Sequence, residues 1–133
     1  MIKPHPFESN SLKRVIVVED DPSLRMSMVS YLAHDGYTVT GIDSAYEFYQ
    51  QVYKEPYTVG IIDIALADQN GIVLVEYARK NTAMRIITLS ERFSTTTLAT
   101  NIKAAGADLN LTKPVNCRLL VAYVNTLFSR LGS

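Results

Sequence analysis

Short aliphatic runs recur along this chain, and each is followed by a stretch with apolar residues at helical spacing. Three of the runs are almost entirely aliphatic: Arg14–Val18, Val59–Ile62 and Met84–Leu89. Such runs are typical of strands buried on both faces of a parallel sheet. Tyr37–Thr40 alternates in the manner of a second strand, and Asp108–Leu111 predicts a short fifth strand.

The stretches after the strands carry the start and stop signals of helices. Pro22 suits a first turn that Asp21 caps, Ser44 caps the next helix, and Gly106 ends the fourth. The expected helices cover residues 22–36, 44–56, 72–80, 98–106 and 116–128. Five strand–helix units in strict alternation predict an α/β fold, with a five-stranded parallel sheet, helices on both faces and right-handed crossovers.

The composition is that of one globular domain. The chain has 133 residues, 47% of them hydrophobic and 20% charged, and its 13 basic and 13 acidic residues balance. This balance argues against direct contact with nucleic acid or with an anionic membrane. The single cysteine, Cys117, fits a reducing compartment, and no apolar run is long enough to cross a bilayer. We therefore expect a cytoplasmic protein with a flexible tail at 1–12 and one domain at 13–131.

Polar residues stand at the ends of the predicted strands. Glu19 and Asp20 follow the first strand, Asp63 the third and Ser90 the fourth, and Lys113 comes soon after the fifth. The carboxyl ends of parallel strands share one edge of a sheet, so these residues are expected to converge. Carboxylates about 4 Å apart repel by about 1 kcal/mol per pair even in a water-like dielectric, and by more where water is excluded. The site therefore needs compensating positive charge.

Lys113 supplies one positive charge, and a divalent cation would supply two more. The ligands at these positions are oxygens, without a His or Cys among them, which favours Mg²⁺ over zinc. A carboxylate beside a metal, a lysine and a hydroxyl is a set suited to phosphoryl transfer. In that chemistry the carboxylate takes the phosphoryl group as an acyl phosphate.

Four segments, in their order and spacing, resemble one known family. They are VIVVEDD, GIIDIALADQNG, IITLS and GADLNLTKP. Each alone is a weak signal, but together they make residues 13–131 similar to the receiver domain of two-component response regulators. The resemblance implies a flavodoxin-like (βα)5 fold that accepts a phosphoryl group and relays a signal. It implies a signalling domain rather than an enzyme that turns over an external substrate.

The resemblance also assigns a metal site. Glu19 and Asp20 match the family's acidic pair, with Asp20 as the direct Mg²⁺ ligand and Glu19 acting through water. Asp63 is expected to ligate the ion as well, and the backbone carbonyl of Ala65 to complete the site.

Asp63 matches the family's phospho-accepting aspartate, which would be phosphorylated by a sensor histidine kinase or a phosphotransfer protein. Lys113, followed by the family's proline, is expected to contact the phosphoryl oxygens, and Ser90 stands at the hydroxyl switch position. Phosphorylation is then expected to rearrange the surface of the fourth helix, fifth strand and fifth helix, through which a homodimer could also form. Both a stand-alone regulator and the N-terminal part of a transcriptional regulator remain open.

Three positions depart from the family pattern. Asn110 stands where receivers usually carry Tyr or Phe, so the usual ring rotation cannot couple the site to its output. Glu91 follows Ser90 where a small residue is common, and this extra carboxylate is expected to slow labelling by anionic phosphodonors, a screened effect of about 1 kcal/mol or less. Ala67 replaces a proline that usually stiffens the loop after Asp63, which predicts a more mobile loop.

Other functions fit parts of the pattern. A degenerate receiver would act as an interaction module without phosphorylation, which Glu91 and Asn110 favour and the intact acidic residues oppose. An aspartate-nucleophile phosphatase would need a second Asp two residues after the nucleophile, where Ala65 stands. A nucleotide-binding module would need a Gly-rich loop after the first strand, and the sequence has none there.

Overall fold

The structure is a computed structural model that describes residues 13–92 and 95–132. The flexible tail expected at 1–12 lies outside the described residues. Strands and helices alternate along the described chain. The elements are β1 (Arg14–Val18), α2 (Pro22–His34), β2 (Thr38–Ile42), α3 (Ala45–Lys54), β3 (Val59–Asp63), α4 (Gly71–Asn81), β4 (Arg85–Ser90), α5 (Thr96–Ala105), β5 (Leu109–Thr112) and α6 (Cys117–Gly132).

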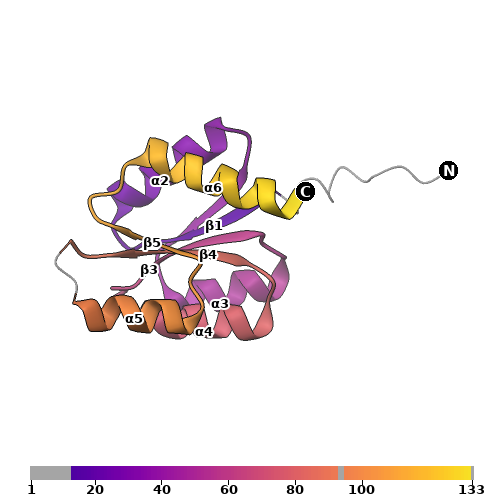
Figure 1. The fold of residues 1–133 in the computed structure, drawn as a ribbon. Helices are drawn as coiled ribbons and strands as arrows, with labels where there is room; N and C mark the ends of the chain where they lie inside the picture. The colour runs from indigo at the N-terminus through magenta and orange to yellow at the C-terminus, as the bar shows by residue number, and fades with distance from the viewer. Residues whose placement is uncertain (1–12, 93–94, 133) are drawn as a thin grey trace.

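The strands lie parallel in one sheet with the order β2-β1-β3-β4-β5. Helices α2 and α6 cover one face of the sheet, and α3, α4 and α5 cover the other (Figure 1). The strand order reverses between β1 and β3, and in open α/β sheets the carboxyl edge at such a reversal is where ligands bind. The predicted flavodoxin-like fold, with a five-stranded parallel sheet and helices on both faces, is therefore confirmed.

Side chains at alternate positions of the strands pack into two separate hydrophobic cores, one on each face of the sheet. Val15 and Val17 of β1 pack toward Met28 on the α2–α6 face, while Ile16 packs with Phe48 on the opposite face. This division follows from the pleat, which points successive side chains to opposite sides of a sheet. Within residues 13–92 and 95–132, no helix combines the length and the apolar character needed to cross a membrane.

The capping residues identified in the sequence act at the helix ends. Asp21 and Ser44 each accept a hydrogen bond from a backbone N–H in the first turn of α2 and α3. Asn116, where the last helix was expected to begin, caps α6 in the same way. Gly106 ends α5 in the left-handed conformation, with a φ of 116° that a residue without a Cβ adopts without strain. These caps explain why the expected helices lie close to the observed ones.

Two strands extend one residue farther than their aliphatic runs predicted. Asp63 is the last residue of β3 and Ser90 the last of β4, because backbone pairing with the neighbouring strand continues past the last apolar side chain. Asp63 is registered with Leu89, and Ser90 with Thr112. Both polar side chains are therefore positioned by the sheet itself rather than by a loop.

The loop after β3 folds back against its own strand. The N–H of Gly71 donates to the carbonyl oxygen of Ile64 at 2.8 Å, and Ala65 and Asn70 form an isolated antiparallel bridge. The backbone segments lie so close that a Cβ on Gly71 would be 2.3 Å from the carbonyl oxygen of Asp63. The loop is thus closed at its base, while the greater mobility expected from Ala67 stays a prediction.

One arginine joins α4 to the turn between α5 and β5. The guanidinium of Arg79 donates to the carbonyl oxygen of Gly106 at 3.0 and 3.2 Å and to the carboxylate of Asp108 at 3.0 Å. The same carboxylate accepts the backbone N–H of Ile86 at 2.7 Å. The carboxyl end of α5 is therefore fixed both to α4 and to the central sheet.

Candidate functional site

The polar residues at the strand ends converge at the carboxyl edge of the sheet. Asp63 is 1% exposed and Glu19 is fully buried, while Asp20 beside it reaches solvent. One carboxylate oxygen from each of Glu19, Asp20 and Asp63 lies within 4.8 Å of the others. The ammonium nitrogen of Lys113, just after β5, lies 2.9 Å from Asp63 Oδ2. The structure therefore brings together the four residues from three strand ends that the sequence pointed to.

Lys113 is shared by three carboxylates. Its Nζ lies 2.9 Å from Asp63, 3.4 Å from Glu19 and 3.8 Å from Glu91. Burial alone would lower the pKa of Lys113, but the hydrogen bond to Asp63 and the surrounding negative charges outweigh it, so the pKa is raised above its ordinary value of 10.5. The lysine is therefore charged at neutral pH. The side chain of Glu91 is 68% exposed, which places it at the rim of the site.

The Asp63 carboxylate is oriented by two opposed contacts. Its Oδ2 accepts the hydrogen bond from Lys113, and its Oδ1 accepts the backbone N–H of Ala65 at 3.0 Å. The two contacts hold the two carboxylate oxygens from different sides, one by the side chain that follows β5 and one by the backbone of the loop after β3. Such pre-orientation favours a nucleophile that must meet an incoming group along one line.

The buried carboxyl of Glu19 has a strongly raised pKa. Burial, followed by interaction with the neighbouring Asp63 carboxyl, raises the pKa of Glu19 to about 7. Its Oε2 accepts the backbone N–H of Asp21 at 3.1 Å, whereas its buried Oε1 has no hydrogen-bond partner among the described residues. A buried carboxylate oxygen without a donor is costly, and this one lies 3.4 Å from the lysine ammonium.

The donor set fits a hard divalent cation. Glu19, Asp20 and Asp63 present carboxylate oxygens close enough to face one ion, and Glu19 also has a buried oxygen, Oε1, that accepts no hydrogen bond from the described residues. Oxygen ligands without nitrogen or sulfur are the preference of Mg²⁺. The acidic group could therefore hold a metal ion, as the sequence predicted.

Ser90 and Asn110 contact each other directly. The side-chain amide of Asn110 donates to Ser90 Oγ at 3.1 Å, and the backbone N–H of Lys113 donates to the carbonyl oxygen of Ser90 at 2.8 Å. The hydroxyl at the predicted switch position is thus bonded to the residue that replaces the family's aromatic ring. Sequence reasoning identified both positions but not this contact.

Two supporting residues were missed from the sequence. Thr88, buried in β4, donates from its hydroxyl to Asn110 Oδ1 at 2.8 Å. The carboxylate of Asp68, in the loop after β3, accepts the backbone N–H groups of Ala45 and Tyr46 at 3.0 and 3.2 Å. These hydrogen bonds lower the pKa of Asp68 below its ordinary value of 3.8. They also tie the loop to the amino end of α3, where a negative charge is favoured by the helix dipole.

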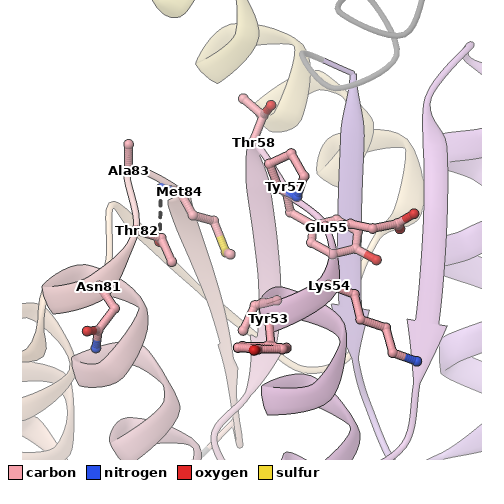
Figure 2. Close-up of a pocket in the computed structure, with 11 residues that line it drawn as sticks. Tyr53, Lys54, Glu55, Tyr57, Thr58, Asn81, Thr82, Ala83 and Met84 are labelled. Carbon is pink, nitrogen blue, oxygen red and sulfur yellow. Dashed lines mark hydrogen bonds between the residues drawn. The ribbon is translucent and has the colours of Figure 1, made fainter.

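A cavity of about 570 Å³ lies away from this site. Figure 2 shows Tyr53 and Tyr57 on one side of it and Thr82 and Met84 on the other. These residues belong to the segments that lead into β3 and β4, so the cavity is at the amino edge of the sheet. It is therefore at the opposite end of β3 from Asp63.

The chain is a five-stranded α/β domain that carries an acidic cluster and a lysine at the carboxyl edge of its sheet. This combination of fold and site is that of receiver domains. The sequence profile of the response regulator receiver domain matches residues 15–125. The chain therefore belongs to the response regulator receiver domain family. Receiver domains are signalling modules rather than classical enzymes.

Some relatives of this chain are about twice its length, and others are close to its own length. The chain is 30% identical over 117 residues to the TorCAD operon transcriptional regulatory protein TorR of Escherichia coli O157:H7, covering 88% of this chain and 50% of that protein. It is 29% identical over 110 residues to the response regulator receiver protein CpdR of Brucella abortus, covering 83% of this chain and 92% of that protein. The chain thus spans about half the length of several curated relatives that it matches, which are transcriptional regulatory proteins.

Solved structures agree with this assignment. A CheY-like response regulator receiver domain protein from Methanospirillum hungatei superimposes with a TM-score of 0.83 at 27% identity, covering 89% of this chain and 94% of that one. The receiver domain of the Francisella response regulator 1452 gives a TM-score of 0.81 at 28% identity, covering 90% and 98%. The flavodoxin-like fold of the chain is therefore that of CheY-like receivers.

Proposed function

We propose that residues 13–131 form a phospho-accepting receiver domain that takes a phosphoryl group onto Asp63. The observation that best supports the proposal is the environment of this carboxylate. It is buried at a strand end, lies 2.9 Å from the ammonium of Lys113, and sits beside the carboxylates of Glu19 and Asp20. Such a set of groups suits the binding and transfer of a phosphoryl group, and family membership agrees with it.

In the proposed reaction an oxygen of Asp63 attacks phosphorus. The new O–P bond forms as the P–N bond to the histidine of the donor breaks, and the bonding electron pair leaves with the imidazole, which takes up a proton. Lys113 neutralises charge on a phosphoryl oxygen, and the hydroxyl of Ser90 donates to another. Attack of water on phosphorus later returns the Asp63 carboxylate and releases inorganic phosphate.

The proposed metal site uses residues of the same edge. Asp20 and Asp63 would ligate Mg²⁺ directly, Glu19 would act through water, and the backbone carbonyl of Ala65 would complete the set. When bound, the ion supplies positive charge to the phosphoryl oxygens during transfer.

The proposed partners follow from the reaction. The donor is a sensor histidine kinase or a phosphotransfer protein, and no external substrate is turned over. The responding surface is formed by α5, β5 and α6, the fourth helix, fifth strand and fifth helix in chain order, which would serve a target protein or a second copy of the chain. The proposal includes a cytoplasmic location, which the single cysteine favours, and it holds for a stand-alone regulator or for part of a transcriptional regulator.

The proposal is tested with a small phosphodonor and metal removal. We expect the intact mass of the protein to rise by one phosphoryl group after incubation with acetyl phosphate and Mg²⁺. Chelation of the metal should slow this gain more than about ten-fold, because metal charge stabilisation is worth several kcal/mol. A protein that gains no mass, and whose spectrum does not respond to beryllofluoride with Mg²⁺, would instead be a degenerate receiver that acts without phosphorylation.

Removing the rim carboxylate is expected to speed labelling by anionic donors. Glu91→Ala should raise the rate of phosphorylation by acetyl phosphate about two- to five-fold, since a screened surface charge is worth about 1 kcal/mol or less. The rate is followed by intact mass, and the gain should shrink at high ionic strength. Glu76→Ala, which removes an exposed carboxylate on α4, is the matched control. Equal rates in the wild type and Glu91→Ala would show that the rim charge does not repel the donor.

A further inference from the structure

Three polar side chains share one face of the β4–β5 pair. Thr88 and Ser90 are two residues apart in β4, so the pleat points them to the same side. Asn110 of β5 is registered directly with Thr88 and therefore points to that side as well. The intervening residues, Leu89 and Leu111, pack into the core on the opposite face. The polar trio thus lies on the α5 side of the sheet, next to the site.

The trio forms a continuous hydrogen-bonded chain. The Thr88 hydroxyl donates to Asn110 Oδ1 at 2.8 Å, and Asn110 Nδ2 donates to Ser90 Oγ at 3.1 Å. Thr88 and Ser90 are buried, whereas Asn110 between them is exposed, so the chain of hydrogen bonds links the buried strand β4 to the surface. The Thr88 hydroxyl also lies 3.3 Å from the carbonyl oxygen of Leu109. In this arrangement Oδ1 of Asn110 faces Thr88 and the amide nitrogen faces Ser90.

We propose that Asn110 is a positioning residue for the hydroxyl of Ser90 and takes the place of the missing aromatic switch. The Ser90 oxygen accepts the amide hydrogen, which leaves its own hydrogen to be donated to a phosphoryl oxygen on Asp63. The arrangement thereby sets the direction of the Ser90 hydroxyl before phosphorylation. This inference rests on the proposed function, because it assigns a role within phosphorylation of the same site.

The chain of hydrogen bonds also connects Ser90, at the site, to Asn110 on β5. When the Ser90 hydroxyl moves toward a phosphoryl group, the amide of Asn110 either follows it or loses the bond. Either outcome changes the hydrogen bonding of a side chain that is itself exposed on β5. The signal therefore passes by a hydrogen bond rather than by the rotation of a ring.

The test compares two substitutions of Asn110 under acetyl phosphate and Mg²⁺. Asn110→Ala should slow phosphorylation about five-fold, within the range expected for one net neutral hydrogen bond. Asn110→Asp should slow it about ten-fold, because a carboxylate accepts the Ser90 hydrogen and withdraws it from the phosphoryl group. Thr88→Val, which no longer fixes the amide, should slow it about two-fold. Asn81→Ala removes an amide that donates to a helix carbonyl in α4 and should leave the rate unchanged.

A spectroscopic measurement separates positioning from simple structural support. The side-chain amide signals of Asn110 in a ¹⁵N–¹H spectrum should shift when beryllofluoride and Mg²⁺ are added to the wild type, and this response should be lost in Ser90→Ala. If the wild type gains phosphate while Asn110→Ala and Asn110→Asp react at its rate, the positioning role is overturned and the proposed function stands. An amide signal that ignores beryllofluoride overturns it equally. A wild type that gains no phosphate overturns both proposals.

Discussion

Asp63→Asn is expected to abolish phosphorylation while leaving the fold intact. The amide oxygen can still accept the backbone N–H of Ala65, which keeps the side chain in place, but a carboxamide is not a competent nucleophile. We expect the rate of mass gain with acetyl phosphate to fall more than about 1,000-fold, as loss of a nucleophile does in covalent catalysis. Lys113 retains Glu19 as a partner, so the free energy of unfolding should be unchanged or higher.

The matched control for this experiment is Asp35→Asn. Asp35 is an exposed carboxylate at the end of α2, far from the carboxyl edge of the sheet, and its substitution should leave the rate of phosphorylation unchanged. Intact mass and peptide mapping report the outcome. Phosphate that still appears on Asp63→Asn would place the acceptor on another carboxylate, and the assignment of Asp63 would then be wrong.

Gly71→Ala is expected to destabilise the protein by about 3 kcal/mol, near the upper end of the cost of overpacking. The added Cβ would lie 2.3 Å from the Asp63 carbonyl oxygen and 2.7 Å from Ile64 Cα, and both neighbours are backbone atoms that cannot rotate away. Helix propensity alone predicts the opposite sign, since alanine in α4 is favoured over glycine by up to about 1 kcal/mol. Urea unfolding followed by circular dichroism measures the difference. The rate of phosphorylation should fall as well, because the strain is transmitted to Asp63.

Gly36→Ala provides the comparison for this substitution. Gly36 has a φ of 101° and no atom within 4 Å of an added Cβ, so its replacement carries only the backbone strain of the left-handed region, about 1–2 kcal/mol. It lies beyond α2 and away from Asp63, so the rate of phosphorylation should not change. If Gly71→Ala costs no more than Gly36→Ala, the close approach at the base of the loop does not constrain the site.

Much of the fold, and the convergence of the candidate site residues at one edge, could be predicted from the sequence. The aliphatic runs around Ile16 and Ile61 required strands covered on both faces, and this requirement fixes a parallel sheet with helices on both sides. Once the strands are parallel, residues that end different strands must share an edge. That is why the strand pattern alone was enough to predict that Asp63 and Lys113, fifty positions apart, lie together.

The contacts that orient the site could not be predicted in the same way. Whether Thr88 bonds Asn110 depends on the register of β4 against β5, which no periodicity in either strand specifies. The carboxylate of Asp68 accepts hydrogen bonds from the amino end of α3 because the loop folds back toward that helix, and no pattern in the loop sequence specifies this path. The residues that contact this loop lie in other elements, so its own sequence does not reveal these contacts.

The contacts of Arg79 have a mechanical consequence for α5. The guanidinium pins the last turn of this helix through Gly106 and Asp108, whereas its first turn begins at Thr96, six residues beyond the end of β4 at Ser90. Because the carboxyl end of α5 is held by Arg79, any displacement of this helix would be largest at its amino end. This amino end lies at the carboxyl edge of the sheet, the edge that carries Asp63.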